Sequence, residues 1–167
     1  MDNKKWFKEA KFGMMIHFGL YSILGGEYKG QYMDYIGEWA QSYFRIPNKE
    51  YHALANVFHP IYFDADEWVK TAKAAGMNYF VITAKHHDGF ALFKSEASKF
   101  NSVDATPFGR DIVGELAESC AKYGMKMGLY YSQTQDWVMA SVITLQPVTT
   151  KSRMKIWETC CMKRLLH

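Results

Sequence analysis

Two adjacent histidines, His86 and His87, have the side-chain types and the position that most directly suggest chemistry. They lie in the stretch AKHHDGF, directly after an apolar, β-forming run over Asn78–Ala84. A neutral imidazole offers one hydrogen-bond donor and one acceptor, which matches the needs of a sugar hydroxyl. The backbone is expected to turn at Gly89, so both rings can tilt toward a pocket at the end of the strand. We therefore interpret the pair as ligands for a polyol.

Two alternatives stay open for the histidine pair. Metal binding is disfavoured because successive strand residues point to opposite faces, whereas alternate positions can share one ion. The sequence contains neither an HxH nor an HxxxH pattern, so no metal and no other cofactor is expected. The second alternative is a pair of core histidines whose hydrogen bonds are satisfied within the protein.

Further candidate residues follow the first apolar run of the chain. His17 ends the expected strand in the motif HFG, and Glu38 and Trp39 are adjacent in GEWAQ. An indole ring can stack on the apolar face of a pyranose while a carboxylate binds its hydroxyls. Taken alone, His17 and Trp39 fit structural roles as well, and it is their combination with the histidine pair that indicates a shared pocket.

The last expected strand contains two adjacent tyrosines, Tyr130 and Tyr131, in the stretch LYYS. Because strand residues alternate between faces, at most one of them points into a pocket. Asp136 follows in TQDW and is a candidate site acid, although loop aspartates are usually solvated. The residues themselves leave the choice between the tyrosines open.

Strands and helices alternate along the sequence, which predicts an α/β fold with a parallel sheet. The expected strands are apolar almost throughout, as in strands buried on both faces. The expected helices follow a proline or an acid, and two of them stop at a glycine. The expected strands cover Phe12–Phe18, Asn78–Ala84 and Lys126–Ser132, and the expected helices cover Asn48–Phe58, Asp66–Ala75 and Asp111–Tyr123.

The position of the polar residues favours a (β/α)₈ TIM-like barrel over a doubly wound sheet. No glycine-rich phosphate loop follows any expected strand, whereas polar side chains follow all of them. A barrel enzyme builds its site from the C-terminal ends of its strands, and a complete barrel needs about 250 residues. With three β/α units in 167 residues, the chain is expected to hold about the first third of such a barrel.

Charge and composition exclude several other classes. The formal net charge of +3 comes from residues 138–167, which carry five basic residues and one acidic residue. The rest is nearly neutral, so no nucleic-acid partner is expected. No apolar run approaches the length of a membrane span, and no apolar signal segment follows the N-terminus. Membrane association is therefore not expected, and the sequence as given predicts a cytoplasmic protein.

Residues 138–167 differ in character from the rest of the chain. They contain no glycine and have no clear periodicity, and they carry the adjacent pair Cys160 and Cys161. One hypothesis is a genuine basic tail. The other is a shift of reading frame near residue 138, because the alternative frame replaces basic codons by acidic ones and introduces glycine. We therefore divide the chain into residues 1–137, the N-terminal part of a catalytic barrel, and an anomalous tail over residues 138–167.

Several motifs together resemble the N-terminal part of the α-L-fucosidases, glycoside hydrolase family 29. The resemblance covers residues 4–137, and the HFG motif and the paired histidines followed by Asp-Gly-Phe are its most specific elements. The stretches that carry it are AKFGMMIHFGLYSILGGEY, GEWA, AKHHDGFALF, FGRDIVGELAESCAKYGMKMGLYYS and DW.

The resemblance implies a role for each matching residue. His17, His86 and His87 resemble the histidines that bind fucose hydroxyls. Glu38 and Trp39 resemble the Glu-Trp pair that lines the same pocket, and Tyr131 resembles a tyrosine that contacts the sugar near the reacting carbon.

The resemblance also implies a reaction. Members of the family have a (β/α)₈-like catalytic barrel, usually followed by a β-sandwich. They release terminal α-L-fucose with retention of configuration, need no metal, and are often secreted, periplasmic or lysosomal. Retention uses a nucleophile and an acid/base, and the family takes both carboxylates from strands beyond residue 137.

Three functions follow as hypotheses. The first is part of a retaining α-L-fucosidase that is inactive by itself, because its nucleophile and acid/base are expected elsewhere. The second is a lectin-like fucose-binding remnant, and the third is a metal-dependent barrel hydrolase. An incomplete barrel leaves sheet edges and one apolar face open, so we also expect an oligomer that covers them.

Overall fold

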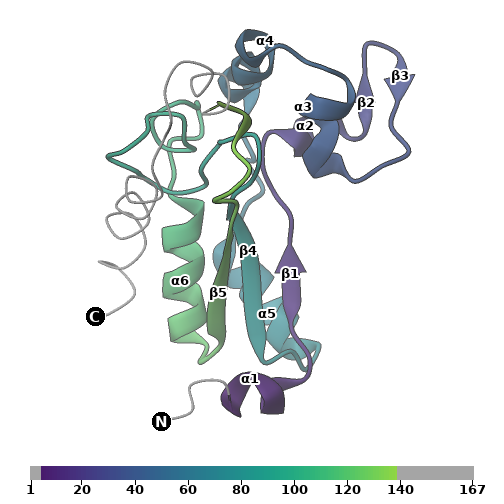
Figure 1. Cartoon of the computed structure of the whole chain (residues 1–167). Coiled ribbons are helices and arrows are strands. Elements are labelled where there is room, and N and C mark those ends of the chain that lie inside the picture. The colour runs from purple at the N-terminus through teal and green to yellow at the C-terminus, as the bar shows by residue number, and fades with distance from the viewer. Residues whose placement is uncertain (1–4, 139–167) are drawn as a thin grey trace.

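Three parallel strands form the centre of the structure, a computed structural model that describes residues 5–138. The strands are β1 (Met14–Ile16), β4 (Tyr79–Lys85) and β5 (Lys126–Tyr131), in the order β1-β4-β5 (Figure 1). The expected α/β class and all three expected strands are confirmed, although β1 is shorter than the apolar run that predicted it. The predicted tail lies outside the described residues except for Val138.

The two long helices begin and end at local sequence signals. The side chains of Asp64 and Asp111 accept hydrogen bonds of 2.9 Å and 2.8 Å from backbone N–H groups in the first turns of α5 (Ala65–Ala74) and α6 (Ile112–Lys122). Such caps satisfy donors that the helix leaves open. Both helices were expected within one or two residues of these bounds.

Each long helix ends in a Schellman motif, which explains the repeated glycine-methionine pairs. Gly76 and Gly124 adopt left-handed φ angles of +81° and +64°. The N–H groups of Met77 and Met125 then bond back to the carbonyls of Ala72 and Cys120, at 3.0 Å and 2.8 Å. Glycine takes this conformation without strain, so each helix turns directly into the next strand.

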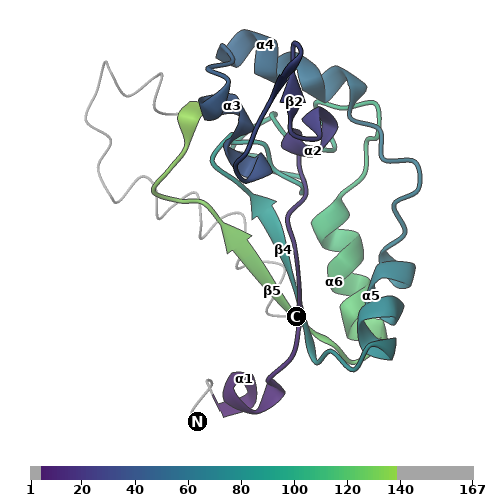
Figure 2. The same cartoon turned by 90° about the vertical axis from the view of Figure 1, so that its right-hand side faces the viewer.

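Both helices cover the same face of the sheet (Figure 2). Residues that are paired across the strands share a face, and the rows that begin with Met14 and Ile16 pack into the main core. The other face carries the rows Met15, Val81, Gly128 and Thr83, Tyr130. Met15 keeps 48% of its surface exposed although Thr83 is only 1% exposed, so this second face, the open face, is covered only in part by the described residues.

A long connection between β1 and α5 lies beyond the C-terminal ends of the strands, at the top and upper right of Figure 1. The sequence predicted one helix here, and the structure divides it into α4 (Asn48–His52) and the 3₁₀ helix η2 (Ala53–Val57). The remaining elements were not predicted. They are α2 (Tyr21–Leu24), β2 (Glu27–Tyr28), β3 (Gln31–Tyr32), η1 (Gly37–Trp39) and α3 (Ala40–Tyr43), together with α1 (Lys5–Ala10) before β1.

No helix over residues 5–138 combines the length and the apolar character needed to cross a bilayer.

Candidate active site

The histidine pair sits at the C-terminal end of β4, in a turn built by a local irregularity. The pairing of β4 with β5 shifts between Thr83 and Lys85, and the chain reverses at Gly89, whose φ is +76°. Bulges of this kind redirect side chains at the end of a strand. His86 and His87 are thereby held with ring centroids 4.1 Å apart, and they are 6% and 8% exposed.

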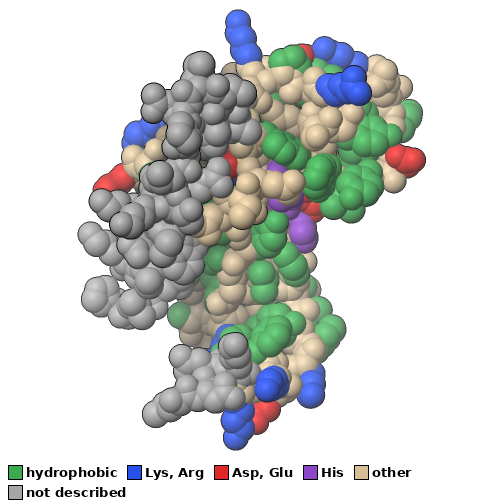
Figure 3. All heavy atoms as spheres, in the orientation of Figure 1, with side chains coloured by type: hydrophobic (Ala, Val, Ile, Leu, Met, Phe, Trp, Pro, Cys, Tyr) green, Lys and Arg blue, Asp and Glu red, His purple; other side chains and the backbone are tan. Residues whose placement is uncertain are grey.

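His17 and Glu38 join this pair from the other side. His17 follows β1 on the row of the open face, and its ring centroid lies 6.1 Å from that of His86. The short helix η1 carries Glu38, whose carboxylate is in direct contact with Nδ1 of His17. The His17 side chain keeps 41% of its surface exposed, so part of its ring faces solvent. In Figure 3, histidine side chains reach the surface where the long connection meets the sheet.

His86 is held as a neutral ring. Burial, together with the nearby charges of His87, His17 and Lys85, lowers its pKa to about 4. Its ring stacks on Tyr130, with centroids 5.1 Å apart and planes 22° apart. Its Nδ1 is buried and makes no hydrogen bond within the described residues.

The tautomer of His87 follows from its hydrogen bonds. Nδ1 lies 2.7 Å from the hydroxyl oxygen of Ser132, and that hydroxyl donates its own hydrogen to the carbonyl of Gln135 at 2.6 Å. Nδ1 must therefore carry the proton, which leaves Nε2 as an acceptor. Burial, with a smaller contribution from Lys85, lowers the pKa of His87, so the ring is neutral near pH 7. A neutral Nε2 can accept a hydrogen bond from a hydroxyl.

Two tryptophans border His87. The ring of Trp39, which ends η1, lies 5.3 Å from the His87 ring, and the Trp137 ring lies 5.4 Å from it. The two indoles are 5.6 Å apart. Trp39 was predicted as a site residue, whereas Trp137 was noted only within the motif DW. Only the fold could show that Trp137 returns to the histidine turn.

Of the two tyrosines on β5, the structure brings Tyr130 to the histidines and not Tyr131. Tyr130 pairs with Thr83 on the open face and lies 6.5 Å from His17 and 5.1 Å from His86, measured between ring centroids. Tyr131 instead packs against Ala84, Ala91 and Phe93, with its ring 4.9 Å from the Lys85 ammonium. The two tyrosines point to opposite faces, as expected from strand alternation. The sequence held no signal for the register of β5, which decides which of them faces the histidines.

The carboxylates near the histidines all have partners. Glu38 bonds His17, and Asp136, the candidate site acid, forms an ion pair of 2.7 Å with the buried Lys85. Asp88 is 1% exposed and accepts hydrogen bonds from the Tyr51 hydroxyl and the Phe90 N–H. Burial raises the pKa of Asp88 to about 6. Each of these three carboxylates is therefore paired with another side chain of the chain.

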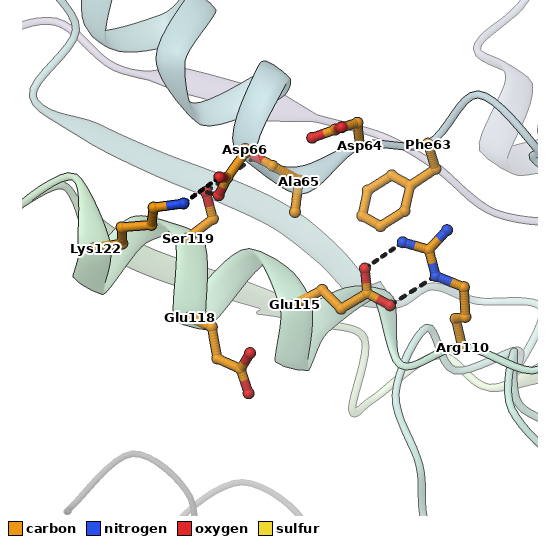
Figure 4. Close-up of a pocket in the computed structure, with 9 residues that line it drawn as sticks. All are labelled: Phe63, Asp64, Ala65, Asp66, Arg110, Glu115, Glu118, Ser119 and Lys122. Atoms are coloured by element: carbon orange, nitrogen blue, oxygen red, sulfur yellow. Dashed lines mark hydrogen bonds and ion pairs between the residues drawn. The ribbon is translucent and has the colours of Figure 1, made fainter.

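A separate hollow lies between α5 and α6, on the helix side of the sheet (Figure 4). Two ion pairs line it, Arg110 with Glu115 and Lys122 with Asp66. It contains none of the predicted site residues. Within residues 5–138, no group of three histidine, cysteine or acidic side chains is placed to hold a metal ion.

The comparison with family models decides the family. The model described as alpha-L-fucosidase matches residues 1–165. The chain belongs to the α-L-fucosidase family. Tissue α-L-fucosidase of Rattus norvegicus is 38% identical over 135 residues, which cover 77% of this chain and 29% of the rat protein. The resemblance drawn from the sequence motifs is thus confirmed.

Solved α-L-fucosidases share the fold of this chain. The unliganded enzyme AlfC from Lactobacillus casei is 59% identical with a TM-score of 0.80, over 83% of this chain and 43% of AlfC. A substituted form of AlfC has been solved with 4-nitrophenyl-α-L-fucopyranoside, at 59% identity, a TM-score of 0.80 and coverages of 82% and 42%.

A second solved relative is a family 29 enzyme from Bacteroides thetaiotaomicron, determined as a trapped covalent intermediate. It is 38% identical with a TM-score of 0.74, over 77% of this chain and 29% of that enzyme. The chain therefore spans less than half the length of each of these α-L-fucosidases.

Proposed function

We propose that this chain supplies the fucose-binding part of a retaining α-L-fucosidase site. The observation that carries the proposal is the cluster of three histidines, Glu38 and Trp39 at the C-terminal ends of β1 and β4. Solved relatives at 59% identity include a complex with a fucoside, which supports the same ligand here. The parent reaction is the release of terminal α-L-fucose from glycans.

The cluster offers groups suited to a fucose ring. The neutral Nε2 of His87 accepts a hydrogen bond from one hydroxyl, and the partly exposed ring of His17 binds another. Trp39 packs its indole against the apolar side of the pyranose. Tyr130 takes the position that the sequence analysis gave to Tyr131, because its ring is stacked on His86.

The chemistry needs two further carboxylates. In a retaining glycosidase one carboxylate attacks the anomeric carbon and the other protonates the leaving oxygen, at a separation of about 5–5.5 Å. The covalent intermediate trapped in the Bacteroides relative supports this two-step route. Glu38, Asp88 and Asp136 are committed to His17, Tyr51 and Lys85, so we assign neither role to them.

The sheet supports the larger architecture that we propose, a (β/α)₈ barrel of which this chain forms the first units. The parallel strands lie in the sheet in the same order as in the chain, β1-β4-β5. Both long helices cover one face of this sheet. A doubly wound sheet would place helices on both faces. In such a barrel the open face would become the interior, covered by further strands or by an oligomeric partner.

The binding proposal is tested by calorimetry with L-fucose, with its mirror image D-fucose as the control. We expect heat of binding for L-fucose alone. Absence of a difference between the two sugars would overturn the proposal. Hydrolysis of 4-nitrophenyl-α-L-fucopyranoside, with and without a chelator, then tests turnover and its expected independence of metal.

The alternative function is lectin-like fucose binding without turnover. It is favoured by the engagement of all three nearby carboxylates. Saturable binding of L-fucose together with complete stability of the nitrophenyl fucoside would support it over hydrolysis.

A further inference from the structure

The segment Ser132–Val138, which follows β5 and is called the latch segment here, is fastened to the histidine turn at several points. The backbone N–H of Ser132 donates to the carbonyl of Lys85 at 2.9 Å, and that of Trp137 donates to the carbonyl of His87 at 2.8 Å. The side-chain bond between His87 and Ser132 adds a further link. The segment thus runs alongside the residues that carry the site.

A buried ion pair also joins the latch segment to the end of β4. Lys85 is 7% exposed, and its ammonium lies 2.7 Å from the Asp136 carboxylate and 4.9 Å from the centre of the Tyr131 ring. A buried cation without a partner is costly, so the pair holds Asp136 in place strongly. This contact directly precedes Trp137 in the chain and fixes where that residue can lie.

The fit between the two segments leaves no room for a side chain at residue 89. A Cβ on Gly89 would lie 2.8 Å from Cγ2 of Val138 and 3.2 Å from Oδ1 of Asp136. The glycine is thus required twice, by its positive φ and by the approach of the latch segment. The position of Trp137 is therefore set by close packing as well as by hydrogen bonds.

The consequence is an aromatic corner made of Trp39, His87 and Trp137, whose ring centroids are 5.3–5.6 Å apart. Trp39 and Trp137 both remain partly exposed, and Tyr35 extends the corner with its ring 6.2 Å from Trp39. Aromatic faces beside hydroxyl-binding groups suit a saccharide, which has apolar C–H faces and polar edges.

We infer that Trp137 is a further substrate-contacting residue that packs against the sugar, and that the ion pair between Lys85 and Asp136 positions it. The inference rests on the proposed fucose site. It adds a wall to that site from the segment after β5, in which the sequence pointed only to Asp136 as a candidate.

The test compares L-fucose binding by the full chain, measured by calorimetry, with binding by Trp137→Leu. We expect about tenfold weaker binding, the size of a lost aromatic contact of about 1.4 kcal/mol. Trp6→Phe is the matched control, because Trp6 lies in α1 at the opposite end of the strands and should leave binding unchanged. Unaltered affinity in Trp137→Leu would overturn the inference and leave the fucose site standing. No binding by the unsubstituted chain would overturn both.

The positioning role is tested without any sugar. Lys85→Met removes the buried cation and leaves Asp136, whose side chain is 20% exposed and can be solvated. We expect acrylamide to quench tryptophan fluorescence more strongly in this variant, and the increase to vanish when Trp137→Phe is added. Identical quenching in Lys85→Met and the unsubstituted chain would overturn the positioning role. Should Lys85→Met fail to fold, Asp136→Asn, which removes the charge at nearly the same side-chain size, takes its place.

Discussion

The hydroxyl of Tyr51 donates a hydrogen bond of 2.9 Å to the buried carboxylate of Asp88, and so joins α4 to the turn that carries the histidines. Both side chains are almost fully buried, at 0% and 1% exposure. The other oxygen of Asp88 accepts from the N–H of Phe90 at 3.2 Å. The turn is therefore bonded to α4, and His86 and His87 cannot move independently of the long connection.

Removing the Tyr51 hydroxyl should destabilise the protein. In Tyr51→Phe the Asp88 carboxylate keeps only its backbone donor, and leaving a buried acceptor unsatisfied costs about 1–3 kcal/mol. Tyr62→Phe is the control, since Tyr62 is 91% exposed. Urea unfolding at pH 7 measures the difference. Equal midpoints for the two variants would show that the bond contributes nothing.

Asp88 should also give stability a characteristic pH dependence. Burial raises its pKa from 3.8 to about 6, so between these values the folded state binds more protons than the unfolded state. The free energy of unfolding contributed by this group therefore falls as the pH rises from about 4 to about 6. At about 1.4 kcal/mol for each pKa unit, the loss is about 3 kcal/mol.

Asp88→Asn removes that titration while it keeps one oxygen acceptor. We expect the free energy of unfolding of the variant, relative to the unsubstituted chain, to increase by about 3 kcal/mol between pH 4 and pH 7. Most contributions from other groups cancel in this difference. Unfolding curves measured at several pH values test it, and parallel dependences for the two proteins would contradict the raised pKa.

Truncation of the histidine pair should remove fucose binding without unfolding the chain. For His86→Ala and His87→Ala we expect no measurable binding of L-fucose and a stability within ~1–2 kcal/mol of the unsubstituted chain. His59→Ala is the control, because His59 is exposed and lies outside the cluster. Calorimetry and thermal unfolding give the two quantities. Loss of folding in both variants would instead favour two core histidines.

The adjacent tyrosines provide a matched pair for the assignment of the aromatic ligand. Tyr130→Phe should weaken L-fucose binding roughly three- to tenfold, as expected for one lost hydrogen bond of about 0.5–1.5 kcal/mol. Tyr131→Phe should bind like the unsubstituted chain, because its ring packs beside Ala84 and Phe93. The reverse result would restore the role that the family resemblance gave to Tyr131.

Much of the fold was predictable because its signals are local. The caps at Asp64 and Asp111 and the glycine-methionine pairs lie within a few residues of the helix ends that they determine. The hairpin of β2 and β3 was missed because its strands have two residues each and carry no detectable alternation. The split of the helix near His52 was also missed, since 3₁₀ and α-helical turns share the same local preferences.

The candidate site was predictable to the extent that its residues end apolar strands. His17, His86 and His87 are brought together as expected, with Glu38 and Trp39 beside them. No pattern pointed to the anchoring role of Asp88 or to the return of Trp137. Both depend on contacts with residues far away in the chain.

The sequence by itself determined the family, the order of the three parallel strands and the two long helices, and the placement of histidines where strands end. These properties depend on short motifs and on local preferences of the backbone. The tertiary structure alone decided that Tyr130 rather than Tyr131 meets the histidines, and that Lys85 binds Asp136. The reason is physical. The face of the sheet to which a strand side chain points depends on the strand register and on one bulge, and packing between distant segments sets both.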